Sequence, residues 1–299
     1  MAFVTVGGCT RLGSEIYSNA NALTARGTAQ LQERAGAEGN SIQLTSAAMP
    51  RLAFASAAEI PVDQLLAEGD RPLPMNGLCP SDMASIDDRF CVDKYEASLV
   101  EITADGSERP YPYYESVDKL PAGHRVRAVS EKGVFPQGYI SGKQAAAACA
   151  ASGKRLCKPS EWKTACKGPE KQQFGYGSKR EAGVCNDNGK SPMGMIHASA
   201  IANGTAFATP SLMNDPQLNQ LAGTLAETGS HDGCTNGYGV HDMVGNIHEW
   251  VDDPAGTFQG GYYLDVEKNG DGCGYRTDAH DFTYHDYSTG FRCCADIGQ

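Results

Sequence analysis

The sequence predicts a mixed α+β domain that is rich in disulfides, with two main helices, short strands and long loops. Eleven cysteines occur without a single C-x-x-C spacing, which favours disulfides in an oxidising compartment over zinc sites. Glycine (35 residues) and proline (15 residues) are frequent in the 299-residue chain, which predicts many turns. Only two segments carry clear helix signals.

Composition limits the classes of partner. The net charge is −11 and the isoelectric point is about 5.1, which argues against nucleic acid, because nucleic-acid binding needs a basic face. Apolar residues make up 40% of the chain, enough for a core. We expect residues 1–9 to end a signal segment, residues 10–75 to form a flexible tether, and residues 76–299 to form the compact domain.

The first nine residues, MAFVTVGGC, resemble the end of a bacterial lipobox, in which Cys9 is acylated. The alternative is a free cysteine near a terminus, and the basic start of a signal peptide is missing. Acylation of Cys9 would leave an even ten cysteines and would place the domain in the bacterial cell envelope, as a periplasmic or outer-membrane lipoprotein. No other segment is long and apolar enough to cross a bilayer, so only this anchor predicts membrane contact.

The elements of the domain follow in order. Cys79 and Cys91 flank a turn and are expected to close a small hairpin by a disulfide, and residues 90–99 alternate like a strand. The first helix is predicted at 141–153, because Ser141 and Gln144 form a capping box motif. The second is predicted at 158–168, where Pro159 suits the first helical position and Gly168 ends the helix. The remaining segments are expected to be loops with short strands at best.

Several motifs then resemble one family in sequence order: AAAACAASGKRLCKPSEWKTACKGP, FGYG, NGYGVHDMVGNIHEWVDD, GGYY and GFRCC. They resemble formylglycine-generating enzymes, the sulfatase-modifying-factor family, over about residues 79–296. The resemblance implies a C-type-lectin-like fold with short twisted antiparallel strands. The two tryptophans, Trp162 and Trp250, both lie in these motifs and are expected to be core aromatics.

The resemblance also implies where catalysis should lie. Family enzymes oxidise a substrate cysteine with two copper(I)-binding cysteines that follow a Gly-Gly-Ser sequence. Here Tyr262 takes the place of the serine, Asp265 takes the place of the first cysteine, and Cys273 resembles the second. A hard carboxylate is a poor copper(I) ligand, so copper is not expected, and Cys273 is the single catalytic candidate if the protein is an enzyme.

Two interpretations of Cys273 remain open, a reactive thiol and half of a disulfide, and we favour the disulfide. The resemblance implies that Cys149 pairs with Cys293. Cys234 and Cys273 are expected to tie two loops near the former active site, although the sequence alone cannot select among the pairings.

Calcium is the cofactor that the resemblance implies. The loop from residue 242 to 250 offers carboxylate and carbonyl oxygens, the ligands that Ca²⁺ prefers. The first site would use Asp242, Met243, Gly245, Ile247 and Glu249, and a second would use Asn186, Asp187, Asn219 and Leu221. The alternative for the first site is a capped turn in which Glu249 pairs with His248 or with an arginine.

The spacing of the histidines marks no metal cluster, so single surface or core histidines are expected. We expect a cleft near the former active site, lined by Tyr262, Tyr263, Asp265, Arg276 and His280, with Tyr284 and Tyr287 as aromatic platforms. The sequence therefore favours a calcium-stabilised binding or structural module of the cell envelope, with a peptide, protein or glycan as ligand. The alternative is an envelope enzyme that modifies a peptide or a small molecule.

Overall fold

A computed structural model describes residues 75–278 and 280–298. The predicted lipobox at Cys9 and the predicted tether up to residue 74 lie outside these residues. Within the described ranges, no helix is long and apolar enough to cross a membrane. The predictions for the compact domain can therefore be compared with the structure, and those for the N-terminal segment stay predictions.

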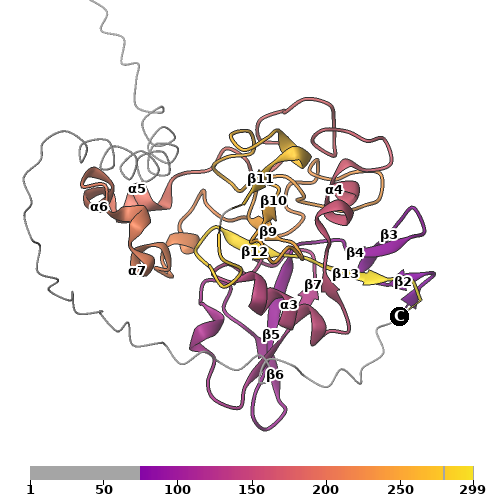
Figure 1. The fold of residues 1–299 in the computed structure, drawn as a ribbon, viewed down its shortest axis with the longest axis horizontal. Helices are drawn as coiled ribbons and strands as arrows, with labels where there is room; N and C mark the ends of the chain where they lie inside the picture. Colours follow the sequence, from indigo (N-terminus) through magenta and orange to yellow (C-terminus); the bar gives the residue numbers. More distant parts are fainter. Residues whose placement is uncertain (1–74, 279, 299) are drawn as a thin grey trace, which may run out of the picture. The chain divides into compact units, whose positions relative to one another are not determined.

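Three small sheets and a short hairpin make up the strand framework (Figure 1). The hairpin pairs β1 (Met75–Asn76) with β2 (Cys79–Pro80). The first sheet joins the beginning and the end of the domain in the order β3 (Met83–Ile86), β4 (Phe90–Asp93), β13 (Cys293–Asp296) and β8 (Arg155–Leu156), all antiparallel. Because β13 lies between β4 and β8, the last strand of the domain closes against its first strands.

The second sheet is antiparallel and has the order β6 (Glu108–Pro110), β5 (Ala97–Ile102) and β7 (Arg125–Ser130). Burial alternates along β7, as a strand with one core face and one solvent face requires. The apolar face of this sheet shares one core cluster with the helix α3 (Gly142–Ala150). The predicted strand at residues 90–99 is in fact two strands, because the chain leaves β4 after Asp93 and enters β5 at Ala97.

The third sheet carries the HEW sequence of the family-like motif. Its order is β11 (Arg276–Thr277), β10 (Phe258–Gln259), β9 (His248–Trp250) and β12 (Thr289–Phe291). β9 pairs antiparallel with β10 and parallel with β12. His248 and Trp250 therefore point to one face of the sheet and Glu249 points to the other.

The two predicted helices are present. α3 begins after Ser141, whose hydroxyl oxygen accepts from the Gln144 N–H while the Gln144 side chain accepts from the Ser141 N–H, so the predicted capping box is confirmed. α4 (Pro159–Lys167) starts on Pro159 and ends at Gly168, whose φ of 68° lies in the left-handed region. Glycine adopts that conformation without a steric penalty.

The segment after α4 was expected to contain no helix, and that expectation was wrong. The structure has several short helical turns there and elsewhere: α5 (Pro192–Ile196), α6 (Ala198–Ala202), α7 (Pro210–Met213), η2 (Val117–Lys119), η3 (Ala206–Ala208), η4 (Leu218–Gln220) and η5 (Gly272–Gly274). α5 and α7 each begin on a proline, a residue favoured at the first helical position. Packing of Met193, Met213 and Leu218 in one core cluster holds these turns in place.

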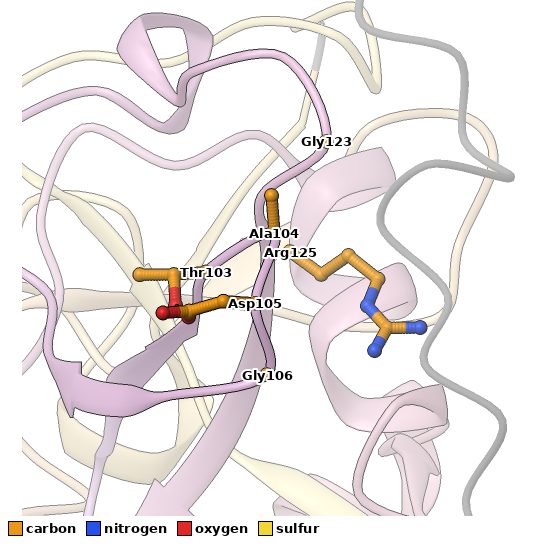
Figure 2. A pocket seen from close by; sticks show the side chains of 6 residues that line it. All are labelled: Thr103, Ala104, Asp105, Gly106, Gly123 and Arg125. Atoms are coloured by element: carbon orange, nitrogen blue, oxygen red, sulfur yellow. The ribbon is translucent and has the colours of Figure 1, made fainter.

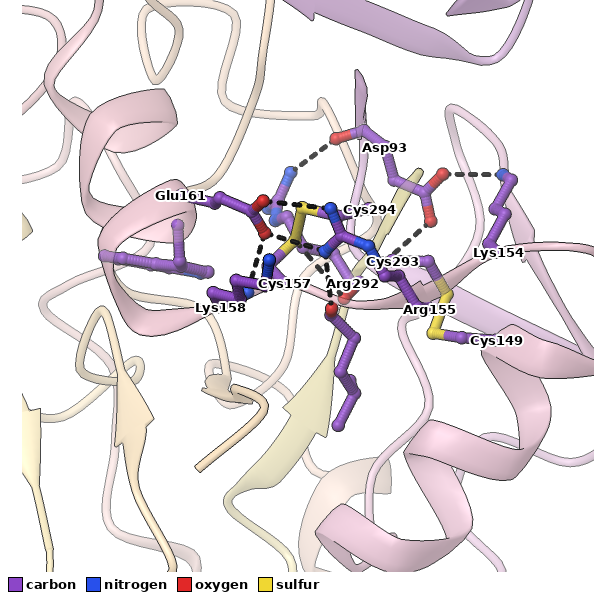
Figure 3. The surroundings of a disulfide bond; sticks show 12 residues. Asp93, Cys149, Lys154, Arg155, Cys157, Lys158, Glu161, Arg292, Cys293 and Cys294 are labelled. Carbon is purple, nitrogen blue, oxygen red and sulfur yellow. Dashed lines mark hydrogen bonds and ion pairs between the residues drawn. A yellow bond between two sulfur atoms is a disulfide. The ribbon is translucent and has the colours of Figure 1, made fainter. Parts of the chain in front are cut away.

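All ten cysteines of the described residues are in disulfides: Cys79–Cys91, Cys149–Cys293, Cys157–Cys294, Cys166–Cys273 and Cys185–Cys234. The first two are the pairings expected from the hairpin and from the family resemblance. Cys293 and Cys294 are neighbours on β13, so their side chains point to opposite faces. One therefore ties the sheet to α3 and the other to the segment before α4 (Figure 3).

The expected Cys234–Cys273 bond was wrong. Cys273 lies on η5, and its backbone N–H donates to the carbonyl of Gln173, shortly after α4, at 2.8 Å. This contact brings η5 against the end of α4, where the Cα atoms of Cys166 and Cys273 are 5.6 Å apart. Cys234 instead meets Cys185 at a Cα separation of 4.8 Å. Both distances lie in the range that a disulfide needs.

Candidate functional site

Cys273 and Asp265 occupy the two positions that resemble the catalytic cysteine pair. Cys273 is almost fully buried and its sulfur is bonded to Cys166. The Asp265 carboxylate accepts hydrogen bonds from the Tyr275 hydroxyl at 3.1 Å and from the backbone N–H groups of Glu267 and Lys268. Neither position offers a thiolate, which is the nucleophile and the soft metal ligand in cysteine chemistry.

The five residues expected to line a cleft differ in their exposure to solvent. Tyr263 is fully buried and Tyr262 is 9% exposed. Arg276 projects outward from β11 and lies 3.6 Å from the carboxylates of both Asp253 and Asp278. His280 stacks on Tyr284 with ring centroids 4.3 Å apart. Tyr262 and Tyr263 therefore belong to the core, and Arg276 belongs to the surface.

A surface hollow of about 560 Å³ lies elsewhere, around the turn between β5 and β6 (Figure 2). Its walls are Thr103, Ala104, Asp105, Gly106, Gly123 and Arg125. Beside it, the buried Glu101 carboxylate accepts two hydrogen bonds from Arg109, at 2.7 and 3.2 Å, and contacts His124. These contacts fix the hairpin, and none of the family-like motifs reaches this hollow.

Three buried polar side chains next to Tyr262 form a connected series, from Asp286 through Ser288 to His248. The Ser288 hydroxyl donates to an oxygen of Asp286 at 2.7 Å, and His248 Nδ1 lies 3.3 Å from the same hydroxyl. The ring of His248 stacks against Tyr262 at 4.6 Å. Burial lowers the pKa of His248 to about 3, so its ring is neutral at physiological pH. His248 is thus a core histidine, as expected, but it belongs to a connected series that the sequence did not reveal.

The first predicted calcium loop is a tightly held turn in which Glu249 is already paired. Both Glu249 oxygens accept from Arg292 at 2.7 Å, and one of them also accepts from the Trp162 indole N–H at 2.6 Å. Asp242 accepts from the Gly229 N–H at 2.6 Å. The alternative of an arginine partner for Glu249 is therefore what the structure contains. Figure 3 shows Arg292 beside the Cys157–Cys294 bond.

A third buried carboxylate, Glu96, completes this loop, and the sequence analysis missed it. One Glu96 oxygen accepts from the Asn246 amide at 2.6 Å, and the other is sealed from solvent without any partner. Burial raises the pKa of Glu96 well above its usual range, and the charges of Asp242 and Glu249 raise it further. Burial also raises the pKa of Asp242 to about 6. Three buried acids thus share one arginine, Arg292.

The second predicted calcium segment meets the first. Asn186 donates from its side chain to Asn246 Oδ1 at 2.9 Å, and its carbonyl accepts from the Asn246 N–H at 2.8 Å. Arg180 donates to the carboxylate and to the carbonyl of Asp187, at 2.7 and 3.0 Å. The Leu221 carbonyl accepts from the Thr224 hydroxyl at 2.7 Å. Several of the expected ligands therefore already have hydrogen-bond partners.

Asn219, the remaining residue of that predicted site, keeps one unpartnered acceptor. Its amide nitrogen donates to the Tyr287 carbonyl at 2.7 Å, while its Oδ1 is buried and has no hydrogen-bond partner. Each predicted calcium segment therefore has one orphaned buried oxygen beside it, at Glu96 and at Asn219. An orphaned carboxylate or amide oxygen is a donor type that Ca²⁺ takes. The described residues contain no group of three or more metal-ligating side chains, so a calcium ion here would need backbone carbonyl oxygens as further ligands.

A family model described as "Sulfatase-modifying factor enzyme 1-like domain" matches residues 68–297. Among curated proteins, "Inactive C-alpha-formylglycine-generating enzyme 2" from Bos taurus is 31% identical over 135 residues, which cover 44% of this chain and 37% of that protein.

Solved structures also resemble this chain. A Major Tropism Determinant I1 variant aligns with a TM-score of 0.40 and 12% identity, covering 78% of this chain and 56% of the other. A protein titled CarF aligns with a TM-score of 0.31 and 17% identity, covering 66% and 57%. The chain spans less than two thirds of each of these relatives.

Proposed function

The chain belongs to the sulfatase-modifying-factor family, and from this premise we propose that its domain is a binding or structural module that does not perform thiol-based cysteine oxidation. The observation that carries the proposal is the disulfide between Cys166 and Cys273. Copper(I) chemistry of the family type needs two thiolates. In this chain one position is a carboxylate and the other sulfur is bonded, so neither can bind copper as a thiolate.

The name of the bovine relative, an inactive formylglycine-generating enzyme, supports the same proposal. It is the name of another protein, which shares 31% identity over part of its length, and it is consistent with a member of the family that lacks oxidase activity. We propose a peptide, protein or glycan as the ligand of the module.

Calcium is proposed as a structural ion of the domain. The side chains of Asp242 and Glu96, with nearby carbonyls, would hold it in the first loop, and Asn219 would contribute in the second, while Glu249 keeps Arg292 as its partner. Its role would be charge compensation, because three buried carboxylates around a single arginine leave uncompensated negative charge in the core. Ligand binding to the native state would then stabilise the fold by mass action.

The same disulfides support a location outside the cytoplasm. Five disulfides in one domain are typical of proteins in an oxidising environment. A lipid anchor on Cys9 and residence in the bacterial envelope remain part of the proposal, supported by the lipobox-like sequence.

An oxidase assay tests the proposal. The purified full chain, loaded with copper(I) and supplied with oxygen, is incubated with cysteine-containing peptides, and aldehyde formation is followed by mass spectrometry. The expected result is no conversion above a copper-only control. Copper-dependent conversion by the native protein, lost in a Cys273→Ser variant, would establish the alternative of an enzyme and reject the module.

A further inference from the structure

His285 has a hydrogen-bond acceptor at each of its two ring nitrogens. Its Nδ1 lies 2.8 Å from Asn214 Oδ1, and its Nε2 lies 3.0 Å from Asp118 Oδ2. The Asn214 amide nitrogen donates to the carbonyls of Pro210 and His285, at 3.0 and 3.2 Å. That orientation turns Asn214 Oδ1, which can only accept, toward the ring. The Nδ1 atom of His285 must therefore carry a hydrogen.

The carboxylate on the other side of the ring is also held in a fixed orientation. Gln144 Oε1 accepts from the Ser141 N–H at 3.0 Å, and Gln144 Nε2 donates to Asp118 Oδ1 at 2.6 Å. The hydrogen bond with His285 is the largest cause that lowers the pKa of Asp118 below its usual range, so this carboxyl is ionised at neutral pH. The Nε2 atom of His285 therefore needs a hydrogen too, and only the charged ring carries both hydrogens.

These contacts join three parts of the fold. Asp118 lies on η2, Gln144 lies in the first turn of α3, and Asn214 directly follows α7. The backbone adds to the connection, because the Tyr287 N–H donates to the last carbonyl of α7 at 3.1 Å. One charged ring, that of His285, thus connects the end of α7 to η2 and, through Asp118, to α3.

The elements packed around this ring carry further titratable groups: Glu115 and Lys119 at η2, Lys143 on α3, His197 and Asp215 near α7, and His280, Asp281, Tyr284 and Asp286 on the loop of His285. Lys119 pairs with Glu115 at 3.7 Å. Asp281 accepts from the Thr283 hydroxyl, and Asp286 accepts from the Ser288 hydroxyl. The contact between His285 and Asp118 therefore depends on the protonation of these two side chains.

We propose that His285 is a pH-dependent switch, which connects the end of α7 to η2 when its ring is protonated and releases η2 when its ring is neutral. Asn214 keeps the hydrogen on Nδ1, so the ring loses its proton from Nε2. The resulting lone pair faces the Asp118 carboxylate at 3.0 Å and is repelled by it. This inference adds a conformational control to the proposed module and does not depend on the identity of its ligand.

The connection is expected to exist in a limited range of pH. Histidine changes its charge between about pH 5 and 8, and the stability that the charged ring provides is present on the acid side of that change and is lost as the pH rises through it. The lowered pKa of Asp118 sets the lower limit, because the contribution of this carboxylate is lost as the pH falls through that value. A domain outside the cytoplasm, as proposed, meets the pH of its surroundings directly.

The test uses the full chain with ¹⁵N-labelled histidine. Long-range ¹H–¹⁵N spectra at about pH 5.5 should show both ring nitrogens of His285 protonated, and Nε2 alone should lose its hydrogen as the pH rises to about 8. Over the same range, the protection of the Asn214 and Tyr287 amides against hydrogen exchange, corrected for the intrinsic rate, should fall about fivefold, as for a partly exposed ion pair. Amides of β5 and β7 are the reference and should keep their protection.

Asp118→Asn distinguishes this switch from a general effect of pH. Its new amide can donate to the Nε2 lone pair of a neutral ring, so protection should no longer fall at the higher pH. His197→Gln is the matched control, because His197 Nε2 also lies 3.0 Å from a carboxylate, that of Asp215, but makes no hydrogen bond there. This variant should keep the fivefold response.

Four results would overturn the proposal. In the native protein, they are a ring nitrogen of His285 that is unprotonated at the lower pH, and amide protection that does not depend on pH. In the variants, they are a native pH response in Asp118→Asn, and loss of that response in His197→Gln. The spectra of the native protein decide the protonation of the ring even if a variant does not fold.

Discussion

Removal of the Cys166–Cys273 disulfide should lower the free energy of unfolding of the domain. The size of the loss depends on the other disulfides that still link the unfolded chain. The bond joins residues 107 apart in sequence. The unfolded chain is already linked by Cys157–Cys294, however, and Cys166 follows Cys157 by 9 residues while Cys273 precedes Cys294 by 21 residues. The ring that the bond closes therefore spans about 30 residues, for which the chain-entropy relation gives roughly 3.5 kcal/mol, against roughly 4.7 kcal/mol for a ring of about 100 residues.

The double variant Cys166→Ser/Cys273→Ser removes the bond without leaving a free thiol, and the Met243 carbonyl, 3.8 Å from the Cys166 sulfur, can accept from the new hydroxyl. Guanidinium unfolding, extrapolated linearly to water, should show a loss of roughly 3.5 kcal/mol. The control Cys79→Ser/Cys91→Ser opens a ring of 12 residues, for which the same relation gives roughly 3 kcal/mol. A loss below about 1 kcal/mol for the first variant, with a normal loss for the control, would refute the assigned bond.

Three further predictions concern single side chains. Glu96→Gln keeps an acceptor for Asn246 but removes a buried charge, so it should raise the melting temperature in chelator and abolish most of the stabilisation that calcium gives to the native protein, about 2.7 kcal/mol at a hundredfold excess over Kd. Tyr263→Phe removes a buried hydroxyl without a partner and should stabilise the fold by about 1 kcal/mol or more, whereas Tyr139→Phe removes a hydroxyl that donates at 2.7 Å and should cost about 1 kcal/mol. Hydrogen bonds from Arg109 hold the pKa of Glu101 below its usual value, so the stability that Glu101→Gln removes should be fully present above the unfolded pKa of about 4.5 and should vanish as the pH falls through the lower folded pKa.

Each of these predictions has a contradicting outcome. If chelation leaves the melting temperature of the native protein unchanged, the proposed calcium site is wrong. If Tyr263→Phe is less stable than the native protein, the Tyr263 hydroxyl has a hydrogen-bond partner. A stability difference between native and Glu101→Gln that persists at the acid limit attributes the effect to packing rather than to the ionised carboxylate.

The helices and the local disulfide could be predicted because their signals are local. The capping box at Ser141 and the proline at Pro159 lie within one turn of the features that they specify. Cys79 and Cys91 are only 12 residues apart in the sequence. The pairing of Cys273 could not be predicted, because it depends on η5 folding back onto the end of α4, a contact between segments about a hundred residues apart in the sequence.

The contacts among the buried polar residues also could not be predicted from the sequence. Glu96 looked like a strand residue between β4 and β5, and only the return of the chain near Asn246 makes it part of an acidic cluster. Asp286 and Ser288 looked like loop residues, and their role depends on the parallel pairing of β12 with β9. The short helices between residues 192 and 213 were missed because tertiary packing, rather than intrinsic propensity, stabilises turns of four or five residues.

The most direct test of the central claim is a map of the sulfur pairs in the native protein. The unreduced full chain is treated with iodoacetamide while folded, then denatured, alkylated again with a mass-labelled reagent, digested and sequenced by mass spectrometry. A peptide that links Cys166 to Cys273, with neither label on Cys273, is the predicted result. Alkylation of Cys273 in the folded protein would mean that the thiol is free and reactive. It would contradict both the Cys166–Cys273 disulfide and the proposal that the domain is not an oxidase.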